Sequence, residues 1–195
     1  KKEILNDMGL SYLEIVDEAL SKMDKIISDT LKYSELRQED VANTNVNLNK
    51  LLKRLKAELN KSYPESTINI IGEFPELFIN ETRVVQIFQN ILDNACKYRD
   101  PEKKSMISIS CHKIFHVYEF HIEDNGIGIP EAQAHRVFEI FQKLNNNKES
   151  NGVGMSIVKK IVENYDGKIW FESEPGVGTT FKFNLPRSLS YSSKM

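Results

Sequence analysis

The sequence predicts an α+β domain, a two-layer sandwich of helices packed on a sheet, preceded by one long helix. Two observations lead to this prediction. Short runs of alternating apolar residues mark strands, and these strands lie among amphipathic helices. The first forty residues instead contain no proline and a single glycine, Gly9. The 195 residues therefore divide into a helical segment over 1–41, a folded domain over 42–187 and a flexible tail over 188–195.

Apolar residues in the first segment recur at spacings of three and four: Leu13, Val16, Leu20, Met23 and Ile27. This spacing is typical of a long amphipathic helix, and its apolar stripe needs a partner. A helical bundle or dimer is the favoured interpretation. The alternative is that the helix packs back on its own domain. The polar stretch over 37–40 is interpreted as the linker.

The order of elements in the folded domain is mixed. Asn80 is expected to cap a helix, Gly167 to provide a left-handed helix end, and residues 174–178 to form the turn of a hairpin. A polar loop is expected over 145–151. The helices are expected over about 48–59, 81–98, 131–144 and 153–166, and the strands over 67–71, 105–112, 115–124, 168–173 and 179–185.

Composition narrows the function classes. A formal charge of −2 lacks the basic excess of nucleic-acid-binding proteins. No apolar run approaches the roughly 18 residues that span a bilayer, so no direct membrane contact is expected for this segment. Cys96 and Cys111 lie in apolar patterns and are interpreted as small core residues. A reducing, cytoplasmic setting is the simplest interpretation.

A polar stripe follows the expected helix over 81–98. Gln86, Asn90, Asn94 and Lys97 fall at helical spacing, with Tyr98 beside Asn94. Two carboxamides one turn apart, followed by a lysine and a tyrosine, suit a hydrated metal ion and anionic oxygens. A solvated helix face has the same pattern.

The segment 124–130, Asp-Asn-Gly-Ile-Gly-Ile-Pro, is a second candidate. Asp124 shares strand parity with Phe120 and Ile122, so its carboxylate should face the helices. An inward carboxylate is costly without hydrogen-bond donors, and the exocyclic amine of adenine is one such donor. Gly126 and Gly128 permit close approach to a flat ligand. The alternative is an ordinary Asp-Asn-Gly turn.

A third candidate is the segment 151–155, Asn-Gly-Val-Gly-Met, which opens a helix. Backbone amides at a helix N-terminus, made accessible by glycines, form a phosphate site. Neither glycine pair is a dinucleotide fingerprint, since the third glycine of G-x-G-x-x-G is replaced by Glu131 or Ile157. The P-loop and the protein Ser/Thr kinase motifs are also absent.

In their order and spacing, five motifs closely resemble the successive boxes of histidine kinase catalytic domains. The resemblance covers about 46–186, and the first forty residues look like the second helix of the family's dimerisation and phosphotransfer hairpin. The segments 97–99 and 141–144 look similar to those of phytochrome-like and other soluble sensor kinases. The five motifs are Asn90–Tyr98, Asp124–Pro130, Val137–Leu144, Gly152–Met155 and Pro175–Phe181.

The resemblance implies the Bergerat ATP-binding fold with ATP and Mg²⁺ as cofactors. Asp124 would bind the adenine amine, and Asn94, with Asn90 near it, would coordinate Mg²⁺. Lys97 would meet phosphate, and Tyr98 would pack near the nucleoside. Asn90, Asn94 and Lys97 are the implied catalytic residues. The implied nucleotide-binding residues are Asn94, Lys97, Tyr98, Asp124, Gly126, Gly128, Ile129, Phe141, Gly152, Val153, Gly154, Met155 and Thr179.

Two further expectations concern the helix around Phe138 and Phe141. The resemblance implies that both rings pack beside a mobile lid formed by roughly 143–151; plain helix core is the alternative. Family members usually have Gly-Thr before the Gly-x-Gly, where this chain has Ser150-Asn151. This departure from the family pattern concerns the phosphate contacts from the lid, and hence the affinity for ATP.

Residue 90 separates kinases from hydrolases in this superfamily, because the hydrolytic members carry a glutamate there as general base. Asn90 cannot accept a proton in that role, which favours transfer to a side chain. The implied partners are a second copy, bound through the N-terminal helix, and the receiver domain of a response regulator. The alternative function is a non-catalytic, nucleotide-binding pseudokinase or regulatory module. A serine kinase of the anti-sigma type is a third candidate with the same pocket, and the long dimerisation-like helix argues against it.

No histidine fits the family's phosphate acceptor, which an acidic residue follows. His112, His116, His121 and His135 are followed by Lys, Val, Ile and Arg, so all four are interpreted as structural or surface residues. We expect that the sequence begins after the acceptor helix. The chain is then expected to bind Mg-ATP without phosphorylating itself.

Overall fold

The computed structural model describes residues 9–13, 15–17, 19, 20, 23, 42–140 and 152–190. The described residues before 24 are helical, which agrees with the predicted N-terminal helix. Their large apolar side chains are exposed, so in this part of the chain they do not pack on the domain. No helix among the described residues is both long and apolar enough to span a bilayer.

The domain is built on a five-stranded sheet with the order β2-β4-β5-β7-β6. Strand β2 runs parallel to β4, and the other neighbours are antiparallel. The strands are β2 (Ser66–Ile71), β4 (Ser105–Ile114), β5 (Val117–Asp124), β6 (Ile169–Glu174) and β7 (Gly178–Pro186). Each of the five predicted strands is therefore confirmed, and β6 and β7 form the predicted hairpin.

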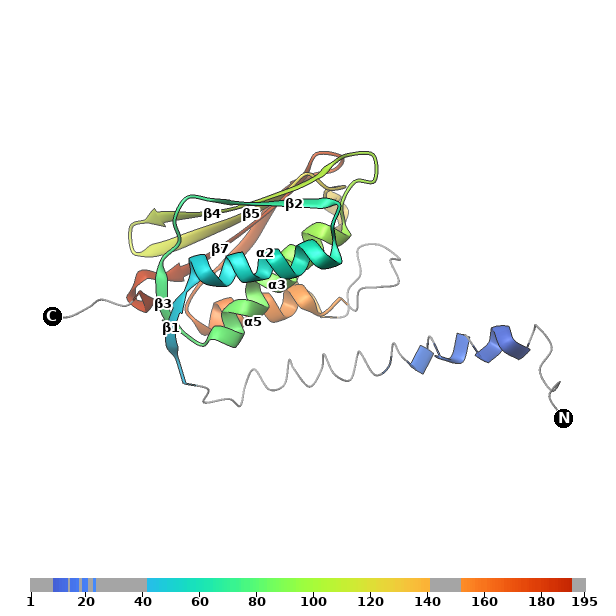
Figure 1. The fold of residues 1–195 in the computed structure, drawn as a ribbon, viewed down its shortest axis with the longest axis horizontal. Helices are drawn as coiled ribbons and strands as arrows, with labels where there is room; N and C mark the ends of the chain where they lie inside the picture. Colours follow the sequence, from blue (N-terminus) through green and yellow to red (C-terminus); the bar gives the residue numbers. More distant parts are fainter. Residues whose placement is uncertain are drawn as a thin grey trace.

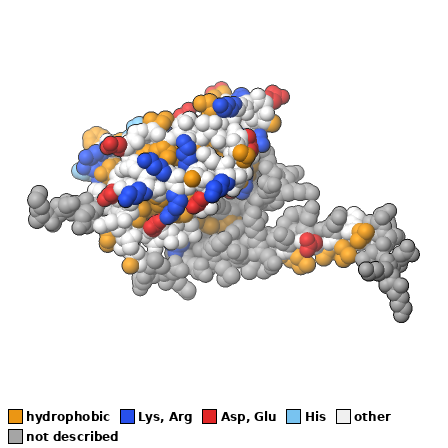
Figure 2. Space-filling view, in the orientation of Figure 1, with side chains coloured by type: hydrophobic (Ala, Val, Ile, Leu, Met, Phe, Trp, Pro, Cys, Tyr) orange, Lys and Arg blue, Asp and Glu red, His pale blue; other side chains and the backbone are white. Residues whose placement is uncertain are grey.

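Three helices cover one face of this sheet, which makes the two-layer sandwich that the sequence predicts (Figure 1). They are α2 (Leu48–Ser62), α3 (Glu81–Lys97) and α5 (Gly154–Asn164). Asn80 Oδ1 accepts a hydrogen bond of 3.1 Å from Arg83 N, so the predicted cap of α3 is confirmed. Figure 2 shows that Lys and Arg side chains gather over α2, while the apolar side of that helix is buried.

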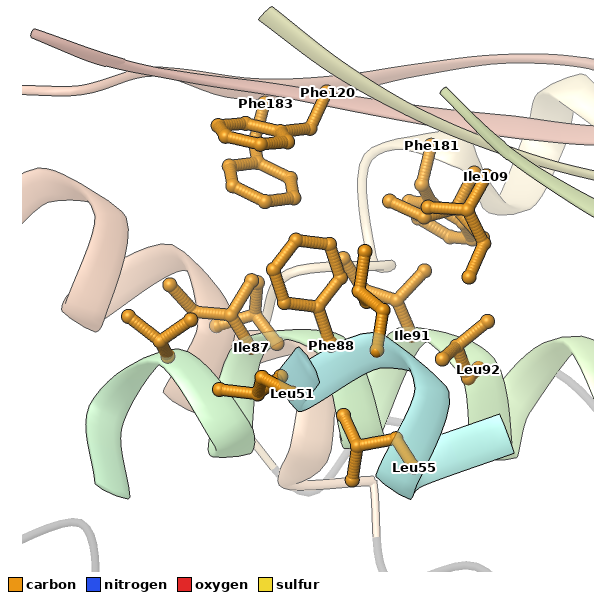
Figure 3. Close-up of a cluster of buried hydrophobic side chains, with 14 of the residues drawn as sticks. Leu51, Leu55, Ile87, Phe88, Ile91, Leu92, Ile109, Phe120, Phe181 and Phe183 are labelled. Carbon is orange, nitrogen blue, oxygen red and sulfur yellow. The ribbon is translucent and has the colours of Figure 1, made fainter. Parts of the chain in front are cut away.

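Aromatic packing fixes α3 under the centre of the sheet. Phe120 of β5 and Phe183 of β7 stack with ring centroids 4.8 Å apart. The Phe88 ring meets both edge-on, at 5.7 and 5.5 Å (Figure 3). All three side chains are at most 1% exposed. Burying a phenylalanine contributes about 1.5–3 kcal/mol, so this cluster holds one side of α3 firmly.

Two strands were not predicted. β1 (Thr44–Asn47) pairs antiparallel with β3 (Glu76–Ile79) in a separate two-stranded sheet. Each has four residues, and only Val46, Leu77 and Ile79 are buried, so the alternation is too short to identify from sequence.

The predicted helix over 131–144 is wrong for 135–140. The helix α4 covers only Glu131–Ala134, and the next residues form turns with hydrogen bonds three residues back. These turns bring the Phe138 ring to Phe171 and Phe181, with centroids 5.9 and 6.5 Å away. Packing on the sheet therefore overrides the helical pattern. Phe141 and the polar loop over 145–151 lie outside the described residues.

The chain after α5 differs from the prediction at two places. Asp166 (φ 56°), not Gly167, takes the left-handed conformation. Gly167 is needed for another reason, since a Cβ there would collide with the carbonyl oxygen of Asn184. The expected tail does not hold for 188–190: η1 (Arg187–Leu189) follows β7, and Ser190 bridges to Leu77.

Candidate nucleotide site

Asp124 ends β5 on the face that the helices cover, as its strand parity predicts. It lies opposite Ile107 of β4 and Thr179 of β7. Burial raises the pKa of its carboxyl from 3.8 to about 6, and the backbone amides of Gly126 and Thr179 partly oppose this. The hydrogen bond from Gly126 N to Asp124 Oδ1 is 2.9 Å. The domain therefore keeps an acceptor in a place where its charge is costly.

The turn after Asp124 lies directly against the end of α3. Ile127 N donates a 3.0 Å hydrogen bond to the carbonyl oxygen of Tyr98, the C-cap residue of α3. A Cβ on Gly126 would collide with that same carbonyl, and it would lie 2.8 Å from Asp124 Oδ1. Glycine is therefore the residue that fits between the carboxylate and the helix end.

The β6–β7 hairpin supports the turn from the other side. Ser173 Oγ accepts from Ile129 N at 2.8 Å and donates to the carbonyl of Gly178 at 2.9 Å. It also lies 2.8 Å from Thr179 Oγ1. Gly128 has φ 71°, and a Cβ there would collide with the backbone of the 174–175 turn. Ser173 was missed by the sequence reasoning, although its parity with Thr179 across the hairpin could have identified it.

The polar face of α3 meets the start of α5. Asn90 Nδ2 donates to the Gln86 carbonyl at 2.8 Å, and its Oδ1 faces Gly154, where a Cβ would come within 2.9 Å. Asn94 lies one turn further and is half-buried, and its side chain has no hydrogen-bond partner among the described residues. Eight residues of helix place Asn90 and Tyr98 about 12 Å apart, so the predicted stripe connects the turn after β5 with α5.

The N-terminus of α5 has the features of an anion site. Gly152 has φ 68°, and among the described residues no side chain caps the helix. Ser156 Oγ donates back to the Val153 carbonyl at 2.7 Å, so it does not occupy the first amides. Val153 and Met155 are buried and anchor the turn in the core. The backbone amides at Gly154 and Met155 therefore begin the helix beside Asn90.

Lys97 forms an ion pair in this structure. Its Nζ lies 2.6 Å from Asp93 Oδ2, and Asp93 Oδ1 accepts a 2.7 Å hydrogen bond from Tyr63 OH. Neither Asp93 nor Tyr63 was predicted. The Asp-x-x-x-Lys spacing on one helix was a signal for the pair, but the tyrosine belongs to α2 and only the fold brings it there.

The donor atoms fit a magnesium ion that arrives with phosphate. Within the described part of the chain, no three His, Cys, Asp or Glu side chains are grouped to hold a metal by themselves. The Asn94 carboxamide is unengaged by other described residues, and Asn90 turns its Oδ1 toward α5. Mg²⁺ prefers oxygen ligands and takes most of them from substrate phosphates and water, which this arrangement permits.

The two cysteines and three of the four histidines belong to the buried side of α3 or to the strands β4 and β5 and the turn between them. Cys96 and Cys111 are free thiols, and burial raises their pKa values to about 11 and about 12, so both stay protonated, as core residues do. His112 and His121 lie on β4 and β5 with ring centroids 4.7 Å apart, and His116 follows β4. These positions agree with surface or structural roles.

Residues 79–189 match the family described as histidine kinase-, DNA gyrase B-, and HSP90-like ATPase. The chain belongs to this family. The match includes α3, the turn after β5, the start of α5 and the β6–β7 hairpin, which are the elements that build the site.

Curated relatives are sensor kinases and phytochromes. Cyanobacterial phytochrome A of Nostoc sp. is 34% identical over 178 residues, which cover 90% of this chain and 23% of that protein. The phytochrome-like protein Cph1 of Synechocystis sp. is 32% identical over 94% of this chain and 25% of that protein. Sensor protein kinase WalK of Staphylococcus epidermidis is 27% identical over 92% of this chain and 31% of that protein. The chain thus spans about a quarter of the length of the two phytochrome relatives.

Solved structures share the fold. Full-length ShkA in complex with AMPPNP superposes with a TM-score of 0.73 at 22% identity, covering 96% of this chain and 40% of that one. Histidine kinase ThkA in complex with the response regulator protein TrrA superposes with a TM-score of 0.70 at 24% identity. The superposition covers 95% of this chain and 53% of that one. The architecture is therefore that of histidine kinase ATP-binding domains.

The raised pKa of Asp124 predicts a pH-dependent stability. Between about pH 4 and pH 6 the folded domain holds a proton that the unfolded chain releases, so stability falls as the pH rises through this window. Asp124→Asn removes the titration and keeps an acceptor for Gly126. Urea melts should show that this variant is more stable than the native chain at pH 7.5, by at most about 3 kcal/mol, with the gain disappearing at pH 4.

Glu123→Gln is the matched control, because Glu123 is the exposed neighbour on the opposite face of β5 and its charge raises the Asp124 pKa less than burial does. It should show no comparable pH-dependent gain. An Asp124→Asn gain that is the same at both pH values would contradict a half-buried carboxylate that titrates in this window.

Proposed function

We propose that this domain binds Mg-ATP and donates its γ-phosphate to a histidine on a dimerisation helix, for relay to an aspartate of a response regulator. One observation supports it most directly. The Asp124 turn and the α5 N-terminus lie at the two ends of one polar face of α3. An acceptor for a base at one end and amides for phosphate at the other match the two ends of a nucleotide.

Asp124 is the proposed adenine contact. The exocyclic amine of adenine donates a hydrogen bond to its carboxylate, which offsets the cost of holding that charge at a buried strand end. Guanine presents a carbonyl oxygen at the equivalent position, which the carboxylate repels. The proposal therefore includes a preference for ATP over GTP. Gly126, Gly128, Ile129 and Thr179 surround this contact.

The phosphates are proposed to lie between α3 and the start of α5. The backbone amides at Gly154 and Met155 donate to phosphate oxygens, and Lys97 adds a positive charge. Asn94, assisted by Asn90, is the proposed magnesium ligand. The ion supplies charge neutralisation on the triphosphate. Tyr98 packs near the nucleoside at the end of α3.

Transfer is favoured over hydrolysis because Asn90 cannot take a proton from water. An imidazole nitrogen needs no such base: it attacks the γ-phosphorus, the N–P bond forms, and the P–O bond to ADP breaks. The domain contributes position and charge neutralisation to this step. All four histidines of the chain lie in strands, turns or after α4, so the acceptor is proposed to be on a different helix.

The partners follow from the same proposal. The exposed apolar side chains of the N-terminal helix suit a homodimer, and the ThkA structure is described in complex with a response regulator. The unpaired thiols support a cytoplasmic location. The alternative is a non-catalytic, nucleotide-binding pseudokinase. Ser150 and Asn151, which motivate that alternative, lie outside the described residues.

Magnesium-dependent ATP binding tests the phosphate end. Asn94→Ala removes the half-buried carboxamide, so calorimetry should show that Mg²⁺ no longer strengthens ATP binding, while affinity without Mg²⁺ changes little. Gln89→Ala, an exposed residue of the same helix, is the matched control and should keep the Mg²⁺ effect. An unchanged Mg²⁺ effect in Asn94→Ala would remove this residue from the site.

A transfer assay separates the kinase from the pseudokinase. With γ-labelled ATP the chain alone should acquire no acid-labile, alkali-stable phosphate. With a histidine-bearing dimerisation hairpin of a sensor kinase fused before residue 1, label should appear on the added histidine. Asp124→Asn should reduce the amount of label on that histidine. ATP binding without any transfer in the fusion would favour the pseudokinase, and labelling of the isolated chain would contradict the histidine assignment.

A further inference from the structure

Two side chains outside the predicted site restrain Lys97. Its Nζ lies 2.6 Å from Asp93 Oδ2, one helical turn earlier. Asp93 Oδ1 accepts a 2.7 Å hydrogen bond from the hydroxyl of Tyr63. Tyr63 is the C-cap residue of α2. These contacts therefore connect a lysine on the polar face of α3 to the end of another helix.

The degree of burial distinguishes this cluster from an ordinary surface ion pair. The side chains of Lys97 and Asp93 are only 18% and 34% exposed. Exposed pairs such as Arg54–Glu81, at 53% and 50%, contribute little and restrain little. Each oxygen of Asp93 has its own partner here, so the plane of the carboxylate is fixed. A fixed carboxylate gives Lys97 a defined direction.

We infer that Tyr63 and Asp93 are positioning residues that hold the Lys97 ammonium ready for the phosphates of ATP. The inference rests on the proposed function, in which Lys97 meets phosphate. An ammonium has three donors and Asp93 engages one, so two remain for phosphate oxygens. A lysine side chain loses much rotamer entropy when it is immobilised, and restraint before binding reduces that cost.

The negative charge of Asp93 also acts on the phosphates. Asp93→Asn therefore combines two opposing effects, since it releases Lys97 and removes a repulsion. Tyr63→Phe is the sharper variant. It deletes one hydroxyl, leaves every charge in place, and keeps the ring that packs against the core.

The test compares affinities of the full chain for Mg-ATP and for adenosine. Tyr63→Phe should weaken ATP binding about 3- to 10-fold, the scale of one hydrogen bond, and leave adenosine binding unchanged. In a Lys97→Met background the same change should have no effect on ATP, because its target is gone. Tyr165→Phe is the matched control: its hydroxyl accepts from Asn80 N at 3.3 Å, at the opposite end of α3. It should not alter the ratio of the two affinities.

Three outcomes would overturn the inference: equal losses for ATP and adenosine, an undiminished effect in Lys97→Met, or no effect of Tyr63→Phe at all. The first two describe a role in folding only. Its failure is separable from failure of the proposed function. If Asp124→Asn weakens ATP binding and Tyr63→Phe does not, only the positioning role is lost. If Asp124→Asn leaves ATP binding unchanged while Tyr63→Phe weakens it through Lys97, the adenine contact of the proposed function is lost and the positioning role stands.

Discussion

The fixed position of α3 is the constraint on which the rest of this domain depends. One side of the helix is held by Phe88, whose ring meets the stacked pair of Phe120 and Phe183 under the middle of the sheet. A helix held on one side presents its other side in a fixed direction. That other side carries Asn90 and Asn94. Interior packing therefore determines where the polar groups of the candidate site can be.

The candidate site also has a cost in stability. Asp124 would be easier to bury as an asparagine, yet its raised pKa shows that the domain holds a carboxyl where ionisation is unfavourable. The amides of Gly126 and Thr179 offset only part of this cost. Under the proposed function, the hydrogen bond that the adenine amine donates to the ionised carboxylate offsets more of this cost. Functional sites commonly retain such locally unfavourable groups.

Sequence reasoning succeeded where a pattern is local. The parity of Asp124 with Phe120 and Ile122 predicted its inward direction. The position of Asn80 just before the helical pattern predicted that it caps α3. It failed where tertiary contacts determine the local conformation. Phe138 interrupts its helical pattern because rings of β6 and β7 offer a better contact than another helical turn. A glycine is required at 167, but close approach to β7, not left-handed geometry, is the reason.

Side chains that contact a site residue from a distant segment are the hardest to predict from the sequence. Nothing near Lys97 indicates Tyr63, which reaches Asp93 from another helix. Ser173 is an intermediate case: it belongs to no motif, although its parity with Thr179 was a signal. One hydrogen bond, from Ile129 N, joins it to the turn after β5, and two contacts hold it within the hairpin. Motifs identify the residues that would touch a ligand, whereas the residues that orient them are selected by the fold.

The central claim is that the turn after β5 and the start of α5 bind the two ends of one nucleotide across α3. A crystal structure of the chain with Mg²⁺ and a non-hydrolysable ATP analogue tests it most directly. The account predicts the adenine amine within hydrogen-bond distance of the Asp124 carboxylate, and phosphate oxygens on the α5 amides with the ion beside Asn94. A nucleotide bound elsewhere, or an adenine that does not contact Asp124, would contradict it.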